Sequence, residues 1–192
     1  MTWTPRTSAP SQGTQPYDWN SSYRLYGGDA QCTWYAYYRV QEGFNITDPP
    51  CWYSGSGSSG YGAWTTAKYW LDHYRDPWQV KGVSGYTPTP GDIIVFTGAS
   101  GHVAVVESKN SDGTYVLTDV NLINGDHNWG RKTNYTFPNT IIGPDHPTGS
   151  VIGVLHYPNA SPDPPTPTDD NIEIILDCYL GKKKKLMKIK IE

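Results

Sequence analysis

Cys-Thr-Trp-Tyr-Ala-Tyr-Tyr-Arg-Val-Gln-Glu-Gly, at residues 32–43, is the first stretch of this 192-residue chain with a regular period. Four of its positions repeat at i, i+4, i+7 and i+8, the spacing of one helix face: Cys32, Ala36, Arg39 and Val40. Gly43 is available as a helix stop. The stretch therefore predicts a short helix that begins at Cys32.

The elements that follow predict the fold class. Residues 63–74 repeat the helical pattern, and Asp76-Pro77 ends it. The segments 98–101 and 110–113 carry the Gly, Ser and Asn of hairpin turns. Around them the apolar period is two, which predicts strands at residues 92–97, 102–108, 114–121 and 151–157. This order predicts an α+β domain with N-terminal helices packed on an antiparallel β-sheet.

The composition divides the chain into parts. Residues 1–157 are expected to form one catalytic domain, which starts with the irregular, Pro- and Ser-rich residues 1–28. Residues 158–171 contain five prolines and predict an extended linker. Residues 172–192 alternate again and predict a hairpin-like tail. A lone hairpin is marginally stable in water, so we expect the tail to need a partner: the domain, a second copy of the chain or a larger assembly.

Charge and hydropathy exclude two classes of partner. Charged residues make up 17% of the chain, the net charge is −3, and Lys and Arg do not cluster before residue 182. This pattern argues against nucleic-acid binding by the main body. No apolar stretch approaches the length of a membrane span, and the first residues lack the pattern of a signal peptide. We therefore expect no nucleic-acid partner and no membrane partner.

Cys32 is the candidate nucleophile. Three cysteines, Cys32, Cys51 and Cys178, leave at least one thiol free or intermolecular, and nothing in the sequence brings Cys51 and Cys178 together as a disulfide. At a helix start, free N–H groups and partial positive charge stabilise a thiolate. The same N–H groups hold the oxyanion that forms when a thiolate attacks a peptide carbonyl.

His102 is the candidate general base. It opens a predicted strand directly after a Gly-rich turn, with its ring on the face shared by Ala104 and Val106. These small neighbours are expected to leave room for a substrate and for the facing helix. Glu107 points away from His102 if the strand is regular, so we interpret it as structural.

The group that orients the imidazole is expected one hairpin later. Asp119 and Asn121 share one face of the next predicted strand, and polar side chains pointing inward from a strand need a partner. Either residue has the chemistry to hold His102 in the tautomer that catalysis requires. The choice between them stays open at this point.

Four stretches together resemble the CHAP amidohydrolase/peptidase family over roughly residues 17 to 157: residues 27–36 (GGDAQCTWYA), 90–96 (PGDIIVF), 101–107 (GHVAVVE) and 119–121 (DVN). The resemblance implies a papain-like α+β fold and hydrolysis of peptidoglycan, at the amide joining muramic acid to the stem peptide or within the peptide. It also implies that Cys32 is the nucleophile and His102 the base. Asp119 stands where the family usually has Glu, and Asn121 matches the family's Asn.

No cofactor is expected. Some phage members of the family carry a calcium loop before the nucleophile, but residues 23–29 offer one carboxylate, whereas calcium takes about six to eight oxygen ligands. A zinc enzyme needs clustered ligands, and the histidines show no metal-binding spacing.

The biological setting follows from the resemblance and from the missing signal pattern. We expect a bacteriophage endolysin, released from the host cytoplasm to the cell wall, with bacterial peptidoglycan as its partner. A lysin of the virion tail is the alternative, with the tail at residues 172–192 used for docking or self-association. A non-catalytic wall-binding module is a third reading, favoured by the fifteen Tyr and eight Trp.

Overall fold

The computed structural model describes residues 3–10, 32–47, 50–51, 67–98, 101–121, 129–141 and 149–158. Its helices are α1 (Cys32–Phe44) and the short 3₁₀ helix η2 (Ala67–Tyr69). Its strands are β1 (Gln79–Lys81), β2 (Ile93–Phe96), β3 (His102–Lys109), β4 (Tyr115–Val120), β5 (Trp129–Tyr135) and β6 (Val151–His156). The predicted linker beyond Pro158 and the predicted tail at 172–192 lie outside the described residues.

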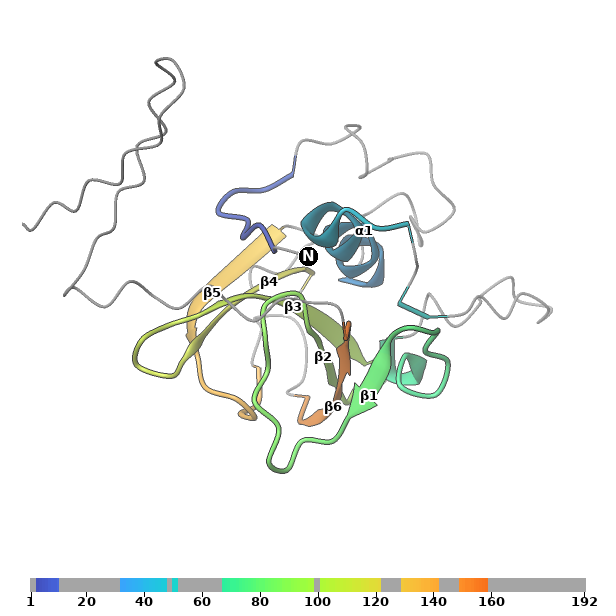
Figure 1. The fold of residues 1–192 in the computed structure, drawn as a ribbon. Coiled ribbons are helices and arrows are strands. Elements are labelled where there is room, and N and C mark those ends of the chain that lie inside the picture. Colours follow the sequence, from blue (N-terminus) through green and yellow to red (C-terminus); the bar gives the residue numbers. More distant parts are fainter. Residues whose placement is uncertain are drawn as a thin grey trace, which may run out of the picture.

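The strands form one antiparallel sheet in the order β1-β6-β2-β3-β4-β5. Helix α1 lies against β3 and β4, the central part of this sheet (Figure 1). The α+β prediction is confirmed at this level, as are the helix that begins at Cys32 and strands β2, β3, β4 and β6. Strands β1 and β5 were not predicted.

The predicted second helix at 63–74 is wrong over its described part. Residues 63–66 lie outside the described residues, and the chain continues as the single helical turn η2, followed by a further turn at residues 70–72. Ala67 and Trp70 are the buried pair here, and they stand three residues apart, which is the period of a 3₁₀ helix. The described residues therefore contain one α-helix, and the plural helices of the prediction are corrected to one.

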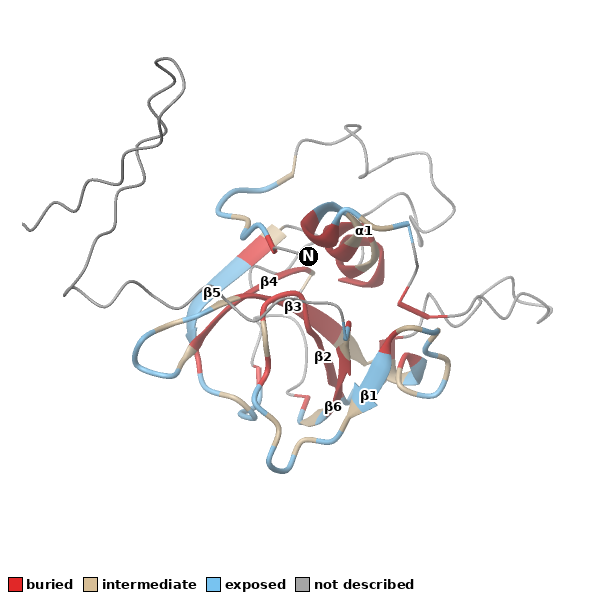
Figure 2. Cartoon of the chain, viewed as in Figure 1, coloured by how far each residue is buried: buried red, intermediate tan, exposed pale blue. Residues whose placement is uncertain are grey.

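The sheet has a different core on each face. Ile93, Val95, Val103 and Val105 pack against α1, whereas Ala104 and Val106 belong to a second cluster on the other face. The expectation that the face of Ala104 and Val106 would meet the helix is therefore wrong. Figure 2 shows burial concentrated in α1, β2, β3 and β4, with β1 and most of β5 exposed.

The N-terminal residues 3–10 run along α1 (Figure 1). The Trp3 ring is 7% exposed, lies 4.9 Å from the Phe44 ring and carries the Arg39 guanidinium at 4.1 Å. A Cβ at Gly43 would stand 2.1 Å from the Trp3 ring, so the glycine makes this close approach possible. The segment predicted as an irregular lead-in therefore contributes to the core at its start.

Among the described residues, no helix combines the length and the apolar character needed to cross a membrane.

Candidate active site

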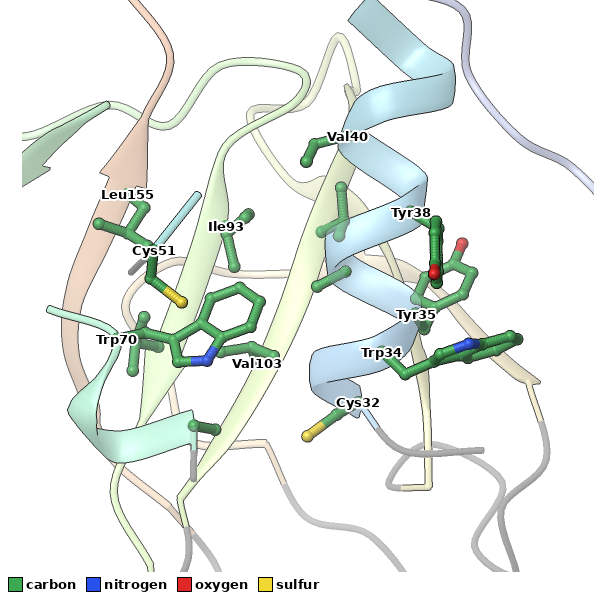
Figure 3. Close-up of a cluster of buried hydrophobic side chains, with 14 of the residues drawn as sticks. Cys32, Trp34, Tyr35, Tyr38, Val40, Cys51, Trp70, Ile93, Val103 and Leu155 are labelled. Carbon is green, nitrogen blue, oxygen red and sulfur yellow. The ribbon is translucent and has the colours of Figure 1, made fainter. Parts of the chain in front are cut away.

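Cys32 is the first residue of α1, as predicted. It is 9% exposed and belongs to the same buried cluster as Trp70 and Val103, and Figure 3 shows its thiol at the N-terminal end of the helix. A thiol in this place faces the positive end of the helix dipole and the N–H groups of the first turn, which have no partner within the helix.

His102 opens β3 directly after Gly101. Gly101 has a φ of 70°, and a Cβ there would stand 2.5 Å from the backbone nitrogen of Lys68 in η2. Because backbone atoms cannot swing aside as a side chain does, the close packing of η2 requires glycine at this position. The turn before His102 is therefore held in place from the side by η2.

Asp119 on β4 makes a direct contact with His102. Its Oδ2 lies 2.6 Å from Nε2 of His102, and Asp119 is fully buried while the His102 side chain is 12% exposed. Val105 pairs with Thr118, so His102 and Asp119 lie on the same face of neighbouring strands, in a diagonal relationship. A buried carboxylate at this distance fixes the ring orientation.

Cys32 is the second partner of His102, through a side-chain hydrogen bond. Because Nε2 faces Asp119, Nδ1 is the ring nitrogen left for the sulfur. Burial alone disfavours the imidazolium, but the thiolate charge of Cys32 and the hydrogen bonds with Asp119 and Cys32 outweigh it. Together they raise the pKa of His102 to about 10. The raised pKa therefore favours a protonated His102 ring beside Cys32.

The other two predicted polar residues lie in different surroundings. Asn121 follows the end of β4 with a φ of 78° and is half-buried. Glu107 is 1% exposed, lies on the helix face of the sheet and pairs with Arg39, with Nη2 and Oε2 2.6 Å apart. The structural interpretation of Glu107 agrees with this placement, away from the ring of His102.

A second histidine–aspartate pair was not found from the sequence. Nδ1 of His156 lies 2.8 Å from Oδ1 of the buried Asp92. The other oxygen of Asp92 accepts hydrogen bonds from the Tyr86 hydroxyl and from the backbone N–H of Thr89. These contacts tie the end of β6 to the loop before β2, so we interpret the pair as a structural brace.

The described residues show no group of three or more His, Cys, Asp or Glu side chains placed to hold a metal ion, and the stretch 23–29 lies outside them. Cys51 is a free thiol that is fully buried, and burial raises the pKa of this thiol. Its environment is the opposite of the one that activates a cysteine.

Comparison with known proteins covers the same part of the chain. The CHAP domain family model matches residues 19–121. The chain is also 35% identical over 105 residues to a Staphylococcus aureus protein named probable autolysin SsaALP. That alignment covers 54% of this chain and 33% of the relative, so the chain spans about a third of the relative's length. The family match contains Cys32, His102, Asp119 and Asn121 and ends before His156.

Proposed function

Because the chain belongs to the CHAP domain family, we propose that it is a peptidoglycan hydrolase, of papain-like fold, that cleaves an amide bond by thiol catalysis. The observation that carries the proposal is the meeting of Cys32, His102 and Asp119 from α1, β3 and β4. A nucleophile, a base and a buried group that orients the base are the parts that such catalysis needs. The name of the staphylococcal relative supports the same substrate class.

The first step is attack by the Cys32 thiolate on the carbonyl carbon of the scissile amide. A C–S bond forms, and the carbonyl oxygen becomes an oxyanion. In this proposal the N–H groups at the start of α1 are the donors to this charge, and such donors supply a large share of the rate acceleration in acyl transfer. The imidazolium of His102 faces the sulfur and is ready to act as the acid.

The second step releases the amine and the third releases the acid. As the C–N bond breaks, His102 gives its Nδ1 proton to the leaving nitrogen, which leaves a thioester on Cys32. Neutral His102 then takes a proton from water, and the resulting hydroxide attacks the thioester carbonyl. Collapse of this adduct breaks the C–S bond, frees a carboxylic acid and restores the thiolate–imidazolium pair.

Asp119 orients His102 through these steps. Its carboxylate accepts the Nε2–H hydrogen bond, so Nδ1 is the nitrogen that exchanges protons with sulfur and substrate. In this proposal Asn121 supports the end of β4 and shares the orienting role to a smaller degree.

The test compares the native chain with Cys32→Ser and His156→Asn on purified cell walls. Muropeptides released by the native chain are identified by mass spectrometry, because new N-termini distinguish cleavage of the N-acetylmuramoyl-L-alanine amide from cleavage within the peptide. We expect turnover to disappear in Cys32→Ser, to persist in His156→Asn and to persist in EDTA. If Cys32→Ser still clears walls at the native rate, thiol catalysis by Cys32 is wrong. If the native chain binds walls without clearing them, the chain is a wall-binding module and the hydrolase proposal is wrong.

The finer proposal on setting is a bacteriophage lysin, acting either as an endolysin released to the wall or as part of a virion tail. It is supported by the Pro-rich residues 158–171 and the Lys-containing alternation of residues 172–192, for which we propose docking to a virion or self-association. An autolysin of a bacterium is the second candidate, favoured by the 35% identity to the staphylococcal protein. Detection of the chain in purified virions, against its detection in uninfected cells, tests the two settings.

A further inference from the structure

A continuous chain of hydrogen bonds, mostly buried, joins β5, α1, β4 and β3. The Trp129 indole Nε1 donates to the Tyr35 hydroxyl at 3.0 Å, and that hydroxyl donates to Oγ1 of Thr118 at 2.9 Å. Thr118 in turn donates to Oε1 of Glu107 at 2.5 Å. Tyr35 and Thr118 are fully buried, and Glu107 is 1% exposed.

The direction of every bond in this chain is fixed by its two ends. An indole N–H only donates, and an ionised carboxylate only accepts. The Tyr35 and Thr118 hydroxyls between them must therefore each accept once and donate once, in the same sense. Burial, followed by the charge of Glu107, raises the pKa of Tyr35 and keeps its phenol protonated. This chain of hydrogen bonds therefore has one arrangement of protons. It is more rigid than an apolar contact would be.

Glu107 is anchored from the other side as well. Arg39 of α1 holds both of its oxygens, with Nε at 2.8 Å from Oε1 and Nη2 at 2.6 Å from Oε2. The backbone N–H of Arg6 adds a bond of 2.9 Å to Oε2. A buried carboxylate that accepts several charge-assisted bonds of this kind is held firmly, because removal of one partner leaves a buried charge without compensation.

Each candidate active-site residue shares an element with a member of this network. Cys32 lies one turn before Tyr35 on α1, Asp119 follows Thr118 on β4, and His102 lies on the same strand as Glu107. Tyr35 is the member that joins the helix to β4, because its hydroxyl reaches Thr118 directly. A shift of α1 along the sheet would break this bond and, at the same time, separate Cys32 from His102.

We propose that the Tyr35 hydroxyl is a positioning group, which holds the helix bearing Cys32 in the one alignment that pairs its thiol with His102. The inference rests on the proposed thiol chemistry and adds a residue to it that does not touch the reacting atoms. Positioning of this kind matters for rate because a displacement of about 1 Å in a reacting group costs on the order of a hundredfold.

The test removes single hydroxyls and leaves the rings and backbone in place. Tyr35→Phe and Thr118→Val interrupt the chain, and Thr118→Ser keeps it. Tyr135→Phe is the matched control, because Tyr135 is 1% exposed and its hydroxyl donates to the Asn139 carbonyl at 2.6 Å in the other core cluster. All variants are assayed with soluble peptidoglycan fragments at a temperature where circular dichroism shows each to be fully folded.

We expect Tyr35→Phe and Thr118→Val to lower kcat by about 10- to 100-fold with little change in KM. Thr118→Ser restores most of the rate, and Tyr135→Phe keeps it. A second readout needs no wall substrate. We expect the pH profile of Cys32 alkylation by iodoacetamide to shift from that of the native chain in Tyr35→Phe and Thr118→Val. It is expected to be unchanged in Tyr135→Phe.

The outcomes separate this inference from the proposed function. If the native chain shows no Cys32-dependent activity, the hydrolase proposal is wrong. The alkylation profiles by themselves then decide whether Tyr35 has the positioning role. Equal kcat values and equal alkylation profiles in Tyr35→Phe and Tyr135→Phe overturn the positioning role, whatever the native activity. If Tyr35→Phe does not fold, the comparison of Thr118→Val with Thr118→Ser gives the same decision.

Discussion

His102 and Asp119 join two neighbouring strands through a 2.6 Å contact between Nε2 and Oδ2, and the carboxylate end of this contact is fully buried. The pair therefore has a charged acceptor in a place that water does not reach. Replacing that acceptor by an amide of the same shape tests how much of the reaction depends on its charge and on the tautomer it selects.

We predict that Asp119→Asn folds normally and loses most of its activity. The amide keeps the shape of the carboxylate but no longer stabilises an imidazolium, and its NH₂ group is able to present a donor to Nε2. In the Ser-His-Asp triad, where an aspartate likewise orients the histidine, replacing that aspartate by asparagine lowers kcat by about 10⁴-fold. Rates on cell walls are compared with those of Asn121→Ala, for which we expect a much smaller loss. A larger loss in Asn121→Ala would assign the orienting role to Asn121.

The pH dependence follows from the raised pKa of His102. Its folded-state pKa is about 10, above the ordinary 6.5, so the folded protein holds a proton that the unfolded chain releases. The stability that this proton contributes is full below about pH 6.5 and is lost as the pH rises through about 10. We expect activity to decline over the same alkaline range, because the leaving amine then loses its acid.

Removing the Cys32 thiol tests whether its charge is what raises the pKa of His102. In Cys32→Ser the charge next to the ring is gone, burial then has greater weight, and the pKa of His102 is expected to fall. Titration of the His102 ring signal by NMR in the native chain and in Cys32→Ser measures the difference. An unchanged titration in Cys32→Ser would contradict the thiolate–imidazolium pair.

Alkylation is predicted to discriminate between the two described cysteines. Cys51 is fully buried in an apolar cluster and burial raises the pKa of its thiol, so it stays a thiol in the folded protein. Cys32 lies at a helix start beside an imidazolium, where thiolates react. Brief treatment with iodoacetamide, followed by peptide mapping, should modify Cys32 and leave Cys51 unmodified until the chain is unfolded. Equal labelling of both in the folded state would be inconsistent with this structure.

Much of the fold followed from the sequence because α1 and the central strands are mostly apolar and buried, the strands on both faces of the sheet. Helix α1 and strands β2, β3, β4 and β6 carry uninterrupted apolar periods and were predicted near their observed bounds. Strand β5 has four consecutive exposed residues from Arg131 to Asn134, and β1 has three residues at the sheet edge, so neither shows a burial pattern that a sequence reveals. Edge strands are specified by backbone pairing more than by side chains.

The candidate site residues were proposed from the sequence, but the contacts between them were not. Extending the register in which Val105 pairs with Thr118 would put Asn121 opposite His102. The strand ends at Val120, and Asn121 takes a positive φ, so the Nε2 contact comes diagonally from Asp119 instead. Such a choice depends on where a strand ends, which periodicity alone fixes poorly.

The N-terminal segment is a further case, and it gives a stability prediction. Trp3 lies far from Arg39 and Phe44 in sequence, yet its ring covers both. We predict that Trp3→Ala lowers the free energy of unfolding by about 3–5 kcal/mol, the range for deleting a buried aromatic side chain. Urea unfolding measures the change, and Trp3→Phe should recover part of it. A loss below about 1 kcal/mol would place Trp3 among ordinary surface residues.

Gly101 and Gly113 form a matched pair for testing how the turn before His102 is held. Both have positive φ values, 70° and 85°, so alanine at either position meets the same backbone strain of about 1–2 kcal/mol. A Cβ at Gly113 has nothing within 4 Å, whereas one at Gly101 would stand 2.5 Å from the backbone nitrogen of Lys68.

Gly113→Ala is therefore expected to lose a little stability and no activity. Gly101→Ala must push η2 and the start of β3 apart, and His102 is the next residue along that strand. We expect its kcat to fall by at least about tenfold, beyond what its loss of stability explains. NMR titration should show the pKa of His102 moving toward its ordinary value as the contacts with Cys32 and Asp119 lengthen. If Gly101→Ala and Gly113→Ala have equal rates per folded molecule, η2 does not control the position of His102.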